Sequence, residues 1–160
     1  FVREIDGVKY YNDSIGTSPA STIAGLNAFD EKIILLAGGS DKGLDYTEIG
    51  EKIAEKVHTL ILCGPTSKII EDAVNEALKR KDKHTMNCEN NDMYKIDQNT
   101  SSDKQINIVH VNNMQEAVAA AKENAKPGDI VLLSPASASF DLYKNFAERG
   151  NIFKEIVNKI

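Results

Sequence analysis

The stretch that decides the fold is IILLAGGSDKG, residues 33–43. Its first five residues are all apolar, which is typical of a parallel strand whose two faces are both covered by helices. Similar short runs, rich in β-branched residues, occur at three further places: Thr59–Cys63, Ile106–Val111 and Ile130–Leu133. The sequence therefore predicts a parallel sheet, with a Gly-Gly turn directly after the strongest of these strands.

Helical periodicity fills the intervals between these strands. The predicted helices are Pro19–Ala28, Tyr46–Lys56, Ser67–Lys81, Met114–Asn124 and a last one from about Tyr143 to the end. Ser18 precedes Pro19, a pairing that predicts an N-cap followed by proline in the first turn. Before the first helix, Asp6-Gly7 predicts a tight turn in a hairpin over Phe1–Asn12.

Alternating strands and helices predict a single α/β domain over residues 1–160, with a doubly wound, mostly parallel, Rossmann-like sheet and an N-terminal β-hairpin. Residues 81–103 are almost entirely polar and break this alternation. We interpret them as a polar surface insertion within the domain, with a partner-binding loop as the alternative.

Ligands of doubly wound sheets bind beyond the carboxyl ends of the strands, so the polar segments there are the candidate sites. Four such segments stand out: residues 12–19, 37–43, 132–141 and 144–151. The first offers Asp13 and hydroxyls at a helix N-terminus, where anions are favoured and where a simple cap is the alternative. In the second, glycines flank Lys42, which is either a ligand-binding cation or a solvated side chain.

The third and fourth segments lead into the last helix. Small residues in SPASAS (134–139) indicate a chain that passes close to a ligand. Ser139 and Asp141 could instead cap the last helix. Phe146 could line a pocket, although its position favours a place in the helix core.

Composition narrows the class of protein. The formal net charge of -5 disfavours a general nucleic-acid surface, which needs a positive field. No apolar run is long enough to span a bilayer, and no secretion signal is evident. Cys63 and Cys88 lack a paired pattern, which favours a reducing cytoplasm, and no cluster has the spacing of metal ligands. Because the chain starts at Phe1 in a strand, we expect a domain cut from a longer protein.

Three motifs in order resemble the C-terminal domain of the Mur ligases, in the branch that adds D-glutamate. They are YYNDSIGTSPASTIAGLNAF (10–29), ILLAGGSDKGLDY (34–46) and PGDIVLLSPASASFDLYKNFAERGNIF (127–153). The resemblance implies an ATP-dependent ligase of bacterial peptidoglycan synthesis, located in the cytoplasm. In the reaction that the resemblance implies, ATP phosphorylates the carboxylate of UDP-N-acetylmuramoyl-L-alanine, and the amine of D-glutamate then attacks the acyl phosphate.

The resemblance also implies site residues. Thr17, Lys42, Ser139 and Phe146 match residues that hold D-glutamate, and Phe140 falls where the family has an apolar residue at the pocket. Asp13 matches a residue near the ATP ribose, whereas Ile15 stands where many relatives have a lysine.

The remaining functions would come from outside this chain. The resemblance implies that the ATP loop and most Mg²⁺ ligands lie in another domain, so the chain alone has no catalytic residue and is expected to be inactive. It would supply the D-glutamate pocket and a lid over ATP. The alternatives are a free-standing module that binds small anions and a Mur-superfamily domain for another amino acid.

Overall fold

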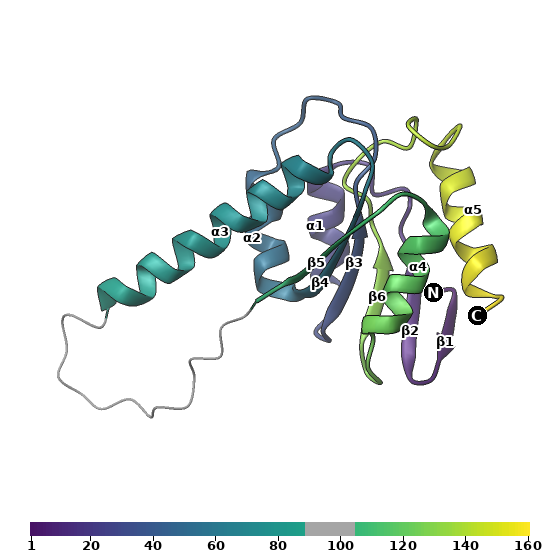
Figure 1. The fold of residues 1–160 in the computed structure, drawn as a ribbon, viewed down its shortest axis with the longest axis horizontal. Helices are drawn as coiled ribbons and strands as arrows, with labels where there is room; N and C mark the ends of the chain where they lie inside the picture. The colour runs from purple at the N-terminus through teal and green to yellow at the C-terminus, as the bar shows by residue number, and fades with distance from the viewer. Residues whose placement is uncertain (89–104) are drawn as a thin grey trace.

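A six-stranded sheet forms the centre of the computed structural model, which describes residues 1–88 and 105–160 (Figure 1). In spatial order the strands are β1 (Arg3–Ile5), β2 (Val8–Asn12), β6 (Ile130–Leu133), β3 (Ile33–Ala37), β4 (Val57–Cys63) and β5 (Asn107–Val111). β1 is antiparallel to β2, and every other neighbouring pair is parallel. The predicted hairpin and parallel sheet are confirmed.

β3 lies in the interior of the sheet, between β6 and β4, and all five of its residues are buried. Its side chains alternate between two hydrophobic cores. Ile33 and Leu35 belong to one core, and Ile34 and Leu36 belong to the other. The unbroken apolar run of this strand is therefore explained by burial on both faces of the sheet.

The helices are divided between the two faces of the sheet (Figure 1). They are α1 (Pro19–Asn27), α2 (Thr47–Lys56), α3 (Ser67–Cys88), α4 (Met114–Asn124) and α5 (Phe146–Val157). The first three pack in one core, through Leu26, Ile49 and Ile70, whereas α4 and α5 pack in the other, through Val118 and Phe153. This arrangement confirms the doubly wound α/β class.

Two helix starts test the capping predictions. Ser18 caps α1 as expected, because its Oγ accepts a hydrogen bond from the Ser21 N–H at 3.3 Å. The last helix begins at Phe146, and its cap is Asn145, whose Oδ1 accepts from the Glu148 N–H at 2.9 Å. The alternative in which Ser139 and Asp141 cap this helix is wrong, since both precede it by several residues.

α3 continues past its expected end. The periodicity predicted a helix to Lys81, but α3 reaches Cys88 and extends beyond the sheet (Figure 1). The first residues of the predicted insertion at 81–103 therefore belong to this helix, and the remainder lies outside the described residues.

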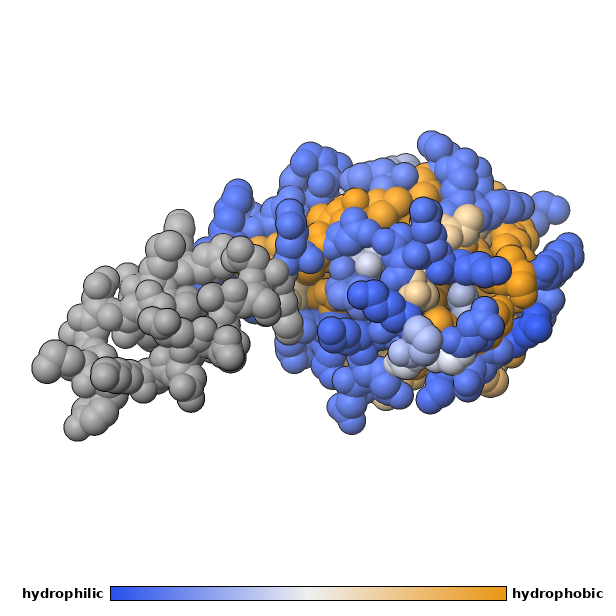
Figure 2. Space-filling model, turned by 60° about the horizontal axis from the view of Figure 1, so that its bottom comes forward, coloured by the Kyte–Doolittle hydropathy of each residue, from blue (hydrophilic) through white to orange (hydrophobic). Residues whose placement is uncertain are grey.

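The face of the described residues that Figure 2 shows is mostly hydrophilic, with apolar areas between the hydrophilic side chains. Within the described residues, no helix has the length and apolar character needed to cross a membrane. The two ends of the chain lie near each other, and Arg3 Nη1 donates to the Asn158 carbonyl oxygen at 3.1 Å.

Candidate functional site

Three loops meet at the carboxyl edge of the sheet, after β2, β6 and β3. The Ala136 N–H donates to the Gly16 carbonyl oxygen at 2.9 Å, which joins the β6 loop to the β2 loop. On its other side, the Ser40 N–H donates to the Ala138 carbonyl oxygen, also at 2.9 Å. The loop after β6 therefore lies between the other two, as the strand order β2-β6-β3 requires.

Close backbone contacts require glycine at positions 38 and 39. A Cβ on Gly38 would lie 2.1 Å from the Cys63 carbonyl oxygen, and one on Gly39 would lie 2.1 Å from that of Ala138. Both residues also have positive φ, at 105° and 148°, where side chains are strained. The glycines thus let the loop after β3 contact the loops after β4 and β6 directly.

Buried hydrogen bonds explain the run of small residues after β6. Ser134 Oγ donates to Asp13 Oδ2 at 2.7 Å and lies 2.9 Å from Thr22 Oγ1. Thr22 Oγ1 also accepts from the Ala136 N–H at 3.0 Å, which helps to hold Ala136 at its unusual φ of 56°. Large side chains would displace this network, so the small residues are explained by packing.

A second buried network connects the other loops. Thr66 Oγ1 accepts from the Gly39 N–H at 3.0 Å and lies 2.8 Å from Ser137 Oγ. Ser137 Oγ lies 3.0 Å from the Tyr46 hydroxyl, which also contacts the Ala136 carbonyl oxygen at 3.3 Å. Thr66, Ser137 and Tyr46 are all buried. The loop after β4 is therefore part of the same edge.

Arg149 of α5 is buried beneath these loops. Its Nε and Nη2 donate to Oγ and the carbonyl oxygen of Ser14, and its Nη1 donates to the carbonyl oxygens of Ser137 and Ala138. Burial lowers the pKa of this guanidinium to about 10, while Asp141 and Tyr143 oppose the shift. Arg149 remains charged near pH 7, and its guanidinium donates four hydrogen bonds to other residues of the protein.

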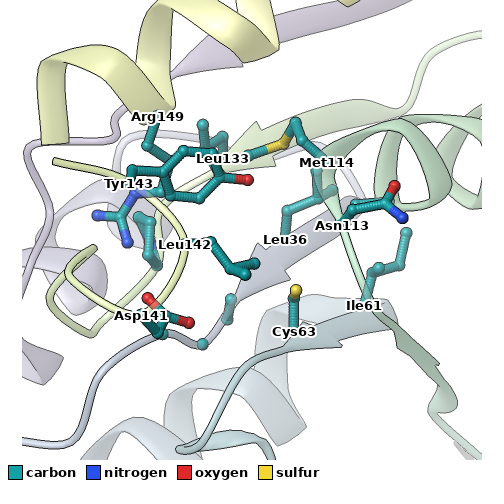
Figure 3. Close-up of a pocket in the computed structure, with 15 residues that line it drawn as sticks. Leu36, Ile61, Cys63, Asn113, Met114, Leu133, Asp141, Leu142, Tyr143 and Arg149 are labelled. Atoms are coloured by element: carbon teal, nitrogen blue, oxygen red, sulfur yellow. The ribbon is translucent and has the colours of Figure 1, made fainter. Parts of the chain in front are cut away.

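A small cavity of about 30 Å³ lies next to Arg149, on the α4 and α5 side of the sheet. Figure 3 shows Leu36 and Cys63 at strand ends, Met114 from α4, and Tyr143 with Arg149 along its walls. Burial raises the pKa of the Cys63 thiol, which disfavours the reactive thiolate. A cavity of this size holds only about two water molecules.

The predicted site residues differ in exposure. Ser139 is buried, with 2% of its surface accessible, and Thr17 is half-buried. Lys42 is exposed, and its ammonium group has no hydrogen bond or ion pair with the described residues. The turn around it is held by the Gly43 N–H, which donates to Asp41 Oδ1 at 2.8 Å. Lys42 is thus free to meet a ligand.

The aromatic candidates lie on the surface. Phe140 and Phe146 are exposed, and the interpretation of Phe146 as helix core is wrong because 43% of its surface is accessible. Phe146 and Ile15 line an open groove of about 230 Å³ between the β2 loop and α5. The structure therefore brings the predicted segments to one edge, but it does not enclose their side chains in a pocket.

Asp13 lies at the border of this edge. It is half-buried, and its Oδ2 is occupied by Ser134, whereas Oδ1 accepts no hydrogen bond from the described residues. One carboxylate oxygen is thus available to a hydroxyl ligand. In the described part of the chain, no group of three or more His, Cys, Asp or Glu side chains is arranged to hold a metal ion.

Sequence reasoning did not select Thr66 or Tyr46. Tyr46 directly precedes α2, and Thr66 lies in the short segment GPT (64–66) that joins β4 to α3. The rule that led to the other loops would have found Thr66. Its contact with Gly39 depends on tertiary packing, for which the sequence carries no local signal.

Comparison with known proteins gives consistent matches. The family described as "Mur ligase, glutamate ligase domain" matches residues 1–137. The chain is 50% identical over 159 residues to the UDP-N-acetylmuramoylalanine--D-glutamate ligase of Acetivibrio thermocellus and 46% identical over 159 residues to that of Ruminiclostridium cellulolyticum. Each alignment covers 99% of this chain and 30% of the relative. A Clostridium botulinum protein of the same name is 45% identical over 160 residues, covering all of this chain and 30% of that protein. The chain thus spans about 30% of the length of these relatives.

Proposed function

Because the chain belongs to the glutamate ligase domain family of the Mur ligases, we propose that it is the D-glutamate-binding domain of a longer, ATP-dependent ligase. The ligase would join the amine of D-glutamate to the carboxylate of UDP-N-acetylmuramoyl-L-alanine through an amide bond. The names of the relatives support this substrate pair, and their identity extends over nearly all of the chain.

The observation that carries the proposal is that the loops after β3 and β6 are hydrogen-bonded to each other close to Lys42, whose ammonium group has no partner among the described residues. The Ser40 N–H bonds to the Ala138 carbonyl oxygen, so Lys42 and Ser139 lie within two residues of this bond on their respective loops. A ligand at this place would meet an ammonium group from one loop and a serine from the other.

D-glutamate has two carboxylates, and a pocket that encloses them needs positive charge and hydrogen-bond donors. We assign Lys42 to one carboxylate, and Thr17 and Ser139 to hydrogen bonds with the amino acid. Phe140 and Phe146 would cover the ligand, which fits their exposure at the same edge. Arg149 is not assigned to the ligand, because its bonds to Ser14 and the β6 loop already use the guanidinium.

The ATP side of the site would lie at Asp13. Its unoccupied Oδ1 fits a ribose hydroxyl as donor, and the neighbouring exposed Ile15 supplies apolar surface but no charge for phosphate. ATP supplies the phosphoryl group that activates the acceptor carboxylate. The Mg²⁺ ligands and the phosphate-binding loop would come from the remaining part of the ligase, since this sequence has no GxxxxGK[ST] motif.

A chimera tests the proposal directly. The matched 30% of the Acetivibrio thermocellus ligase is replaced by this chain, and amide product and ADP are measured with UDP-N-acetylmuramoyl-L-alanine, ATP and Mg²⁺. We expect turnover that saturates with D-glutamate, as in the unmodified ligase. Turnover with another amino acid but not with D-glutamate would contradict the assignment.

A further inference from the structure

Thr66 occupies a position at which its hydroxyl would ordinarily cap a helix. It lies immediately before α3, and its carbonyl oxygen accepts from the Ile70 N–H at 3.0 Å. A threonine at such a position usually accepts from an N–H of the first turn. Here the side chain instead contacts Gly39 and Ser137, two residues of other loops. Its hydroxyl therefore serves the carboxyl edge of the sheet.

Thr66 contacts both backbone polar groups of Gly39, its N–H and its carbonyl oxygen. Its Oγ1 accepts from the Gly39 N–H at 3.0 Å and lies 3.2 Å from the Gly39 carbonyl oxygen, and the Thr66 N–H donates to the same oxygen at 3.1 Å. Gly39 is the last glycine before Ser40 and Lys42. The path of the loop that carries Lys42 is thus fixed by a residue of the neighbouring strand's loop.

The same hydroxyl also contacts the loop that carries Ser139. Ser137 Oγ lies 2.8 Å from Thr66 Oγ1 and 3.0 Å from the Tyr46 hydroxyl. The protons of the three hydroxyls can be placed in one direction, from Tyr46 to Ser137, then to Thr66 and finally to the Gly39 carbonyl oxygen. Every buried polar atom of this chain of hydroxyls is then satisfied.

We propose that Thr66 is a positioning residue of the D-glutamate site, which fixes the Lys42 loop relative to the Ser139 loop through Gly39 and Ser137. The inference rests on the proposed function. Thr66 does not touch the ligand; it acts through the two loops that do. Since none of its surface is accessible, water cannot replace its hydroxyl when that is removed.

The test uses the longer ligase that contains this chain, with Thr66→Val, which keeps the shape and removes the hydroxyl. We expect the KM for D-glutamate to rise by roughly tenfold, while the KM for ATP changes by less than about twofold. Thr66→Ser restores the hydroxyl and should return the KM for D-glutamate to within about threefold of the wild-type value.

The matched control is Thr59→Val. Thr59 is also a buried threonine, on β4, but its hydroxyl contacts His58 Nδ1 away from the carboxyl edge. This variant should leave both KM values within about twofold of wild type. An equal rise for D-glutamate and ATP in Thr66→Val, or no rescue by Thr66→Ser, would overturn the positioning role.

If Thr66→Val does not fold, Ser137→Ala tests the positioning role of Thr66 instead. It breaks the connection between Thr66 and Tyr46 and leaves the Gly39 bond in place, so a smaller rise in the same KM is expected. Near-normal saturation by D-glutamate in this variant would then refute the inference. A wild-type ligase that does not use D-glutamate would refute the proposed function itself, which separates the two failures.

Discussion

Arg149 donates two hydrogen bonds of 2.9 Å to Ser14, from Nε to the hydroxyl oxygen and from Nη2 to the carbonyl oxygen. Ser14 Oγ in turn donates to the Phe146 carbonyl oxygen at 2.8 Å. These bonds hold the first turn of α5 against the loop after β2. The planar guanidinium suits this geometry, because a lysine could not present donors in two fixed directions.

We expect Arg149→Met to lower the free energy of unfolding by at least about 2 kcal/mol, because it leaves several buried oxygens without donors. Denaturant unfolding of the isolated chain measures this. Arg80→Met is the control, since Arg80 is exposed and pairs with Glu51 at 3.0 Å, an interaction worth less than about 1 kcal/mol. Equal losses in the two variants would contradict a structural role for Arg149.

Gly39→Ala should prevent stable folding or displace the loop after β3. The added Cβ would lie 2.1 Å from the Ala138 carbonyl oxygen, a backbone atom of another loop. Gly43→Ala provides the comparison, since its φ is also positive, at 66°, but apart from the residue itself and its chain neighbours no atom of the described residues lies within 4 Å of the added Cβ. There we expect a loss of only about 1–2 kcal/mol. Thermal melts of both variants distinguish close contact from backbone strain alone.

Lys42→Met in the proposed ligase should largely abolish ligation while the protein melts normally. The reason is that an enclosed carboxylate without a cation is costly. D-glutamate saturation curves provide the measurement. Lys126→Met, an exposed lysine between α4 and β6, should change activity by less than about twofold. Near-normal saturation in Lys42→Met would remove this residue from the site.

Ser139→Ala should reduce kcat/KM for D-glutamate by roughly tenfold to a hundredfold, the scale of a hydrogen bond to a charged group. The apparent KM for ATP should change much less. Steady-state kinetics with each substrate varied in turn provide the comparison. If both substrates were affected equally, the loss would reflect a general disturbance of the buried loop rather than contact with the amino acid.

The isolated chain should neither hydrolyse ATP nor form the amide, because its sequence lacks a phosphate-cradling loop. A coupled assay for ADP release, with and without D-glutamate, checks this. The unmodified Acetivibrio thermocellus ligase serves as the positive control. ATP turnover that copurifies with the chain through successive columns would contradict the prediction.

The apolar periodicity of the sequence predicted the limits of those helices and strands whose apolar residues are buried. β6 and α4 have the predicted limits, because apolar residues end there and turn residues follow. α5 begins later than predicted, since residues 140–145 form a loop that ends at the Asn145 cap. The mixture of apolar and polar residues in this segment could not be distinguished locally from the first turn of a helix.

The candidate segments were predictable because parallel strands share one carboxyl edge. Their internal bonds were not. Arg149 has the sequence signature of a solvated helix residue, and only the packing of α5 shows that it is buried. Likewise, Thr66 and Gly39 are 27 residues apart, and nothing in either segment indicates that they meet.

The place of β6 in the sheet constrains how the chain folds. Tyr10 pairs with Val131, so β2 and β3 acquire their common neighbour only through contacts between distant parts of the chain. Such contacts form slowly, because a long loop must close before they stabilise anything. During synthesis, a ribosome-bound chain that lacks β6 has a gap between β2 and β3 and no SPASAS segment. The edge that we assign to D-glutamate is therefore completed only after β6 and the segment that follows it have been synthesised.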